Sequence, residues 1–113
     1  MLVGSRALFS SRRLIKNLYS SLYQYLILEN QNIKLRLRNG DIITVSRFLY
    51  PRIIYYYYLG YLNDINKNEI SFKIDNKVYS LPINVLSSSN IGGIILLIKS
   101  NWQYKNNHWE KME

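Results

Sequence analysis

The sequence has no cysteine and only one histidine, His108. The lack of cysteine excludes thiolate metal sites and thiol nucleophiles, and one histidine cannot supply the several ligands that a metal site needs. A hydrolytic triad is not indicated, because His108 lies in a short terminal turn far from any aspartate-rich segment. Asp41, Asp64 and Asp75 all fall at predicted turns, where aspartate is expected for backbone reasons. We therefore predict no catalytic and no metal-binding residues.

Phosphate-binding glycine loops and long apolar runs are also missing. The Gly92-Gly93 pair has neither the GxGxxG nor the Walker spacing of a phosphate-binding loop, so no cofactor is expected. The longest apolar run, Ile94 to Ile98, ends at Lys99 and is far shorter than the roughly 20 residues of a membrane span. These absences predict a cytoplasmic protein that is not an enzyme and does not span a membrane.

The sequence contains enough apolar residues for one hydrophobic core, and its positive charge is unevenly distributed. Its 113 residues, of which 48% are hydrophobic, fit a single domain over residues 1–113. The net charge is +8, and residues 1–52 carry +7 of it, whereas residues 53–113 carry only +1. A basic half indicates a polyanionic partner or an acidic protein surface. The alternative is a solvated face that keeps a tyrosine-rich protein soluble.

The amino-terminal part predicts a flexible segment over residues 1–10 and then a helix from Ser11 to Glu29. The helix prediction rests on apolar residues at three- and four-residue spacing, namely Leu14, Ile15, Leu18, Leu22, Tyr25 and Leu26. Arg12 and Arg13 then lie at the helix start, where positive charge opposes the helix dipole. These two arginines are either contacts for an anion or part of a solvated turn.

The clearest local signal is a β-hairpin. Residues 33–38 alternate between apolar and basic, Asn39-Gly40 predicts a type I′ turn, and an apolar strand returns over residues 42–45. The alternation places Lys34, Arg36 and Arg38 in a row on the face away from the core. Such a row suits phosphates or acidic side chains, and it also suits an edge strand that must resist aggregation.

A second helix is predicted between Ser46 and Leu62, with Pro51 in its first turn and Gly60 at its end. The run Tyr55 to Tyr58 would then be spread around the helix, with some members buried and some exposed. The alternative is a strand, in which the same run puts two tyrosines on each face. Four tyrosines suggest base stacking, but their helical spacing beside apolar residues is more typical of core and interface. Arg47 and Arg52 flank the helix start and complete the set of candidate partner contacts.

The carboxy-terminal half repeats the same kinds of element. A polar loop is predicted over residues 63–68, and a hairpin over residues 70–81 with its turn at Asp75-Asn76. A short helical turn is then predicted over residues 83–86. Residues 87–90 are expected to cap a helix from Ile91 to about Ser100. Residues 102–109 predict a third hairpin within the tail 101–113, with two aromatic arms around Asn106-Asn107. The predicted fold is a small α+β domain of two or three β-hairpins packed with two or three helices.

Three stretches carry a resemblance to a known family: LRLRNGDIITVSRFLYPRIIYYYYLGYL, IDNKVYSLPINVLSSSN and NWQYKNNHWEKME. Together they resemble the amino-terminal accessory region of archaeal FkbM-like methyltransferases, which depend on S-adenosylmethionine. The resemblance covers about residues 15–113. It implies an accessory module without the catalytic domain, because the chain stops at Glu113, where that domain would begin. The resemblance assigns none of the family's functional residues to positions in this chain.

Three functional hypotheses follow. The first is a non-catalytic module that presents the basic hairpin face and the aromatic tail to a protein partner, either a methyltransferase domain or a second copy of this chain. The second is a nucleic-acid-binding protein that uses the basic hairpin face, although no RNA-recognition signature is present. The third is the non-catalytic part of a split methyltransferase whose catalytic domain is a separate chain.

Overall fold

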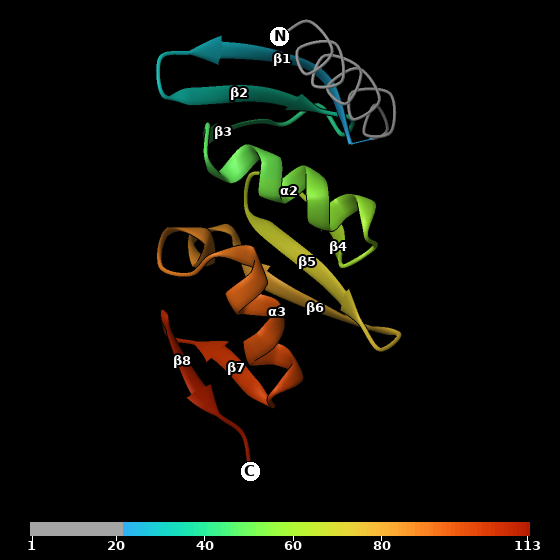
Figure 1. Ribbon diagram of the computed structural model, residues 1–113, viewed down its shortest axis with the longest axis vertical. Coiled ribbons are helices and arrows are strands. Elements are labelled where there is room, and N and C mark those ends of the chain that lie inside the picture. Colours follow the sequence, from blue (N-terminus) through green and yellow to red (C-terminus); the bar gives the residue numbers. More distant parts are fainter. Residues whose placement is uncertain (1–21) are drawn as a thin grey trace, which may run out of the picture.

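A computed structural model describes residues 22–113 of the chain as a small α+β single domain, which confirms the predicted fold class (Figure 1). Within these residues, eight strands form three small antiparallel sheets, and two α-helices and one 3₁₀ helix connect them. The domain is elongated, with extents of 53 × 28 × 25 Å. Its radius of gyration of 15.3 Å exceeds the value of about 13 Å expected for a compact chain of this length.

The first sheet, sheet A, has the strand order β1-β2-β3. Its strands are β1 (Tyr23–Glu29), β2 (Asn32–Leu37) and β3 (Ile42–Ser46). The alternation in β2 works as predicted, because Ile33, Leu35 and Leu37 are buried on one face while Lys34 and Arg36 lie on the other. The hairpin of β2 and β3 is therefore confirmed.

The predicted helix from Ser11 to Glu29 is wrong over its last turns, because Tyr23–Glu29 forms strand β1. Its antiparallel partner is β2, with Leu26 opposite Leu35 and Leu28 opposite Ile33. Tyr25 and Leu26, which were assigned to one helical stripe, therefore point to opposite faces of a sheet. The predictions for residues 1–10 and for the helix start, including Arg12 and Arg13, lie outside the described residues.

The turn at Asn39-Gly40 is present, but its type differs from the prediction. The backbone N–H of Gly40 donates to the carbonyl of Leu37 at 3.0 Å, and the N–H of Leu37 donates to the carbonyl of Asp41 at 2.8 Å. Only Gly40 has a positive φ, of 96°, whereas a type I′ turn needs two such residues. The loop is thus a three-residue connection over residues 38–40, in which glycine alone takes the left-handed backbone.

Helix α2 (Leu49–Tyr58) confirms the second predicted helix. Pro51 lies in its first turn, where its missing N–H costs nothing. Gly60 follows the helix with a φ of 88°, its N–H donates to the carbonyl of Tyr57, and the N–H of Tyr61 donates to the carbonyl of Tyr56. This pair of bonds is a Schellman cap, which satisfies the last carbonyls of the helix.

The second sheet, sheet B, contains β4 (Leu62–Ile65), β5 (Glu69–Ile74) and β6 (Lys77–Pro82) in sequential order. Its β5–β6 hairpin is as predicted, and Asp75 and Asn76 both have positive φ in the turn. Strand β4 is a correction, because residues 63–68 were expected to be loop. It pairs with β5 through Leu62 and Ile65, which are buried at its two ends.

The remaining elements agree with their predictions. A 3₁₀ helix η1 (Ile83–Ser87) leads to α3 (Ile91–Lys99), and the side chain of Asn90 caps α3 by accepting the N–H of Gly93 at 2.6 Å. Strands β7 (Trp102–Lys105) and β8 (His108–Lys111) form a two-stranded sheet, sheet C. The turn between them has positive φ at Asn106 and Asn107.

One apolar core joins these elements. Figure 1 shows α2 between sheets A and B, and α3 between α2 and sheet C. The core includes the inner face of sheet A, Ile53 and Ile54 of α2, Phe72 of β5 and Ile94 of α3. The described residues include no helix of the length and apolarity that crossing a membrane requires.

Candidate functional site

The basic residues singled out in the sequence do not form one continuous row. Lys34 and Arg36 lie together on the outer face of sheet A, where Tyr25 and Ile27 of β1 are their neighbours across the strands. Arg38 lies beyond β2, in the loop to β3. Arg47 lies at the other end of β3, where its N–H donates to the carbonyl of Gln31. The predicted row is therefore confined to two cations.

These two cations have specific contacts on β1. The Lys34 ammonium lies 3.6 Å from Oε1 of Glu29, and the Arg36 guanidinium lies 5.9 Å from the centre of the Tyr25 ring. Strand β2 is the middle strand of sheet A. The interpretation of Lys34 and Arg36 as guards of an exposed strand edge is thus wrong, because both edges of β2 are paired.

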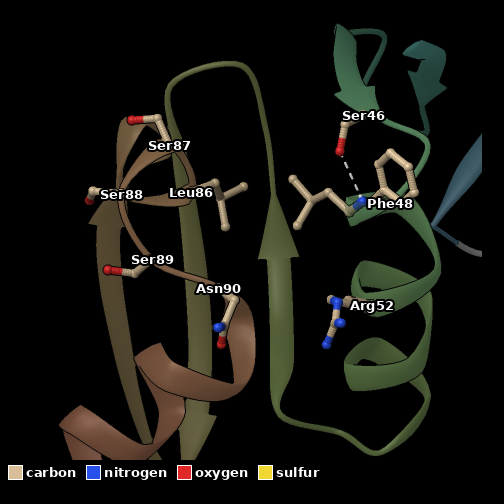
Figure 2. A pocket seen from close by; sticks show the side chains of 9 residues that line it. Ser46, Phe48, Arg52, Leu86, Ser87, Ser88, Ser89 and Asn90 are labelled. Atoms are coloured by element: carbon tan, nitrogen blue, oxygen red, sulfur yellow. Dashed lines mark hydrogen bonds between the residues drawn. The ribbon is translucent and has the colours of Figure 1, made fainter. Parts of the chain in front are cut away.

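Arg52 takes part in a different feature, an open groove between the start of α2 and the loop that leads into α3 (Figure 2). One wall comes from α2 and the residues before it, and the other from the end of η1 and the segment that follows it. In Figure 2, Arg52 and Asn90 lie toward the same end of the groove. The lining residues are Ser46, Phe48, Leu49, Arg52, Leu86, Ser87, Ser88, Ser89 and Asn90.

The polar groups along the groove are mostly engaged within the fold. Ser46 Oγ accepts the N–H of Leu49 at 3.0 Å, which holds the start of α2 (Figure 2). Ser87 and Ser88 donate to main-chain carbonyls, at 2.6 and 3.4 Å, and Ser89 Oγ accepts the indole N–H of Trp109 at 3.1 Å. The run of serines is therefore explained by local structure, since such hydroxyls commonly bond to nearby backbone.

Arg52 is the one charged residue among those that line the groove. Apolar side chains line the same groove, namely Phe48, Leu49 and Leu86. Such a combination suits a carboxylate next to an apolar group, because guanidinium binds carboxylate and the apolar surface gains from being covered. The groove is thus a candidate contact for an acidic and apolar partner.

Helix α2 extends this surface along its exposed side. Phe48, Arg52, Tyr55 and Leu59 are spaced four, three and four residues apart, so they lie on one face of the helix. The flanking residues Phe48 and Leu59 keep helical backbone angles. Phe48 is 79% exposed, which is unusual for a phenylalanine. Together with the exposed Tyr58, these residues are called the α2 surface below.

Sequence reasoning placed Arg52 among the candidate contacts but missed the rest of the α2 surface. The helical spacing of Phe48, Tyr55 and Leu59 could have indicated this surface, because it puts them on the side of the helix opposite the buried Ile53 and Ile54. The tyrosine run was expected to include both buried and exposed members. Tyr55 and Tyr58 are exposed, whereas Tyr56 and Tyr57 are half-buried against the core and none of the four is fully buried.

The single histidine was expected in a short terminal turn, but it is the first residue of β8, directly after the turn of sheet C, and pairs with Lys105 of β7. Its Nδ1 is 3.2 Å from the carbonyl of Asn106, and its Nε2 is 3.3 Å from Oε2 of Glu110. The described part of the chain contains no group of three or more histidine, cysteine, aspartate or glutamate side chains that could hold a metal ion.

No family model, curated protein or solved structure matches this chain. The case for a function therefore rests on the surfaces described above.

Proposed function

We propose that this chain is a non-catalytic module that binds a protein partner through the α2 surface. The observation that carries the proposal is the exposure of Phe48 on the same helix face as Arg52 and Tyr55. Aromatic residues and arginine are enriched where protein interfaces gain most of their binding energy. A phenylalanine, two tyrosines and a leucine on one exposed helix face also form an apolar patch of the kind that marks interaction sites.

The charge around the α2 surface indicates the character of the partner. Arg47 and Arg52 flank its beginning, and no acidic residue lies between Asp41 and Asp64. A partner surface with carboxylates beside apolar side chains complements this arrangement. The family resemblance makes an S-adenosylmethionine-dependent methyltransferase domain the first partner to test, either as a separate protein or as the catalytic half of a split enzyme.

Binding is best measured by titrating FkbM-like methyltransferase domains against the labelled chain. We expect Phe48→Ala and Tyr55→Ala each to weaken binding at least about tenfold, because central aromatic contacts contribute most. Val78→Ala is the matched control, since Val78 is an exposed apolar residue on β6, away from α2. The proposal would be contradicted if all three variants lost the same amount of binding affinity, or if the unaltered chain did not bind.

Nucleic-acid binding is the second candidate, and the contact of Arg36 with Tyr25 on the outer face of sheet A favours it. A cation beside an exposed aromatic ring on an open sheet suits single-stranded nucleic acid, through phosphate contact and base stacking. This surface is separate from the α2 surface. Loss of oligonucleotide binding in Tyr25→Ala, with Phe48→Ala unaffected, would favour this candidate over the first.

A further inference from the structure

Strand β1 is an edge strand with an unusual surface. Its one neighbour in sheet A is β2, and no other strand among residues 22–113 pairs with it. Four consecutive apolar side chains along it are exposed: Tyr25 by 42%, Leu26 by 36%, Ile27 by 44% and Leu28 by 57%. Because successive side chains alternate between faces, apolar groups are uncovered on both sides of this edge.

Edge strands of stable monomers usually carry a feature that prevents further pairing, such as proline, lysine or a bulge. Residues 25–28 include neither proline nor charge. The one irregularity of β1 lies between Tyr23 and Tyr25, so the strand is regular from Tyr25 to Glu29. This regular stretch can therefore accept another strand along its whole length.

The charged neighbours of β1 show which strand fits. The ion pair of Lys34 with Glu29 and the contact of Arg36 with Tyr25 both draw a cation of β2 toward β1. The edge thus presents an acid at one end of the regular stretch and, at the other, a cation over Tyr25. An antiparallel copy of the same strand presents these charges in the reverse order.

We propose that a second copy of this chain pairs with β1 in an antiparallel, two-fold symmetric arrangement. Full pairing of residues 25–29 places Ile27 opposite Ile27 of the partner subunit, because Ile27 is the midpoint. Leu26 then faces Leu28 of the partner subunit on the inner side of the sheet. On the outer side, Tyr25 faces Glu29 of the partner subunit, whose carboxylate comes next to the Arg36 guanidinium.

This pairing satisfies the backbone groups along the free edge of both copies and joins the two sheets into one of six strands. The interface is the same on both sides, so the assembly closes as a dimer rather than growing into a fibre. It uses sheet A and leaves the α2 surface open. The proposal therefore stands independently of the partner proposed for α2.

The first test is sedimentation of the full chain over a concentration series. We expect a reversible monomer–dimer equilibrium, and we expect Ile27→Lys to raise the dimer dissociation constant at least about tenfold, because it sets two like charges directly opposite each other. Thr44→Lys is the matched control, since it adds the same charge to the same sheet face on β3, the other outer strand. The proposal would be overturned if the chain stayed monomeric at all concentrations. It would also be overturned if only Thr44→Lys, and not Ile27→Lys, raised the dimer dissociation constant.

A second test examines the charge contact across the two-fold axis. Glu29→Arg alone should weaken the dimer, because it places two guanidinium groups together. The double variant Glu29→Arg with Arg36→Glu restores opposite charges and should recover most of the affinity. No recovery in the double variant would contradict the register that we propose.

The register can also be tested by cross-linking, because the chain has no cysteine. The Ile27→Cys variant carries one thiol per copy, and directly opposite residues of antiparallel strands lie within disulfide range. We expect mild oxidation to convert it to a covalent dimer much faster than Thr44→Cys. Equal rates for the two variants would mean that Ile27 does not lie on the symmetry axis.

Discussion

The indole Nε1–H of Trp109 donates a hydrogen bond to Oγ of Ser89, with 3.1 Å between the two atoms. Trp109 belongs to β8, and Ser89 belongs to the wall of the groove opposite α2. The ring of Tyr104 packs edge-on against Trp109, with 5.3 Å between the ring centres. The terminal hairpin is thereby attached to the loop that shapes the groove.

We expect Trp109→Phe to destabilise the domain by about 1 kcal/mol, because a half-buried hydrogen bond is lost while most of the ring remains. Chemical unfolding measures the change. Trp102→Phe is the control, since it removes an indole of the same strand pair that does not bond to Ser89. If the two variants lost the same free energy of unfolding, the hydrogen bond to Ser89 would contribute nothing to stability.

Gly40→Val should destabilise the domain by about 1 kcal/mol or more, because a β-branched residue resists the φ of 96° at this position. No atom lies within 4 Å of the added Cβ, so the loss comes from the backbone and not from a clash. Gly40→Asn should cost less, since asparagine tolerates the left-handed region. Thermal unfolding compares the melting temperatures of the two variants. An unchanged melting temperature for Gly40→Val would contradict this description of the loop.

Gly92 and Tyr56 should show coupled effects. A Cβ at Gly92 would lie 2.8 Å from Oη of Tyr56, so alanine brings α3 into conflict with that hydroxyl. Alanine also favours helix by up to about 1 kcal/mol over glycine. We therefore expect Gly92→Ala to be near neutral alone and stabilising in a Tyr56→Phe background. A double-mutant cycle measures the coupling, and additive effects would show that the tyrosine moves freely.

The basic residues of the first hairpin give a prediction about nucleic acid. If they neutralise phosphates, alanine at Lys34, Arg36 and Arg38 lowers the log–log slope of affinity against salt by about 2 to 2.7. We expect instead weak binding that the triple variant leaves unaltered, because only two of these cations share a face and Lys34 contacts Glu29. Fluorescence titration at several salt concentrations separates the two outcomes.

The chain alone should not bind S-adenosylmethionine, because its sequence offers no glycine-rich loop for a cofactor. Isothermal calorimetry with the full chain is the direct measurement. Saturable binding in the micromolar range would contradict the proposal of a non-catalytic module.

The parts of the fold that the sequence predicted correctly are those with strong local chemistry. Turns at Asp75-Asn76 and Asn106-Asn107 suit left-handed backbone, and α2 has Pro51 and Gly60 at its two ends. These signals act within a few residues, so they need no knowledge of the tertiary structure.

The errors occurred where tertiary contacts decide. Tyr25 and Leu26 fit a helical stripe equally well, and only pairing with β2 makes residues 23–29 a strand. Strand β4 was missed because Asn63 and Asp64 look like loop residues, although Leu62 and Ile65 anchor the strand beside β5. The α2 surface was partly missed because the same aromatic residues serve in cores and at interfaces, and local spacing does not show which face is covered.

Every strand in the described part of the chain pairs only with strands that adjoin it in sequence. Chains dominated by such local pairings have low contact order and fold fast, since little loop entropy is lost before each contact forms. Each sheet can therefore assemble as soon as its own residues leave the ribosome, without waiting for a distant partner. The amino-terminal sheet, with its apolar edge, is then the first of the three to meet other molecules in the cell.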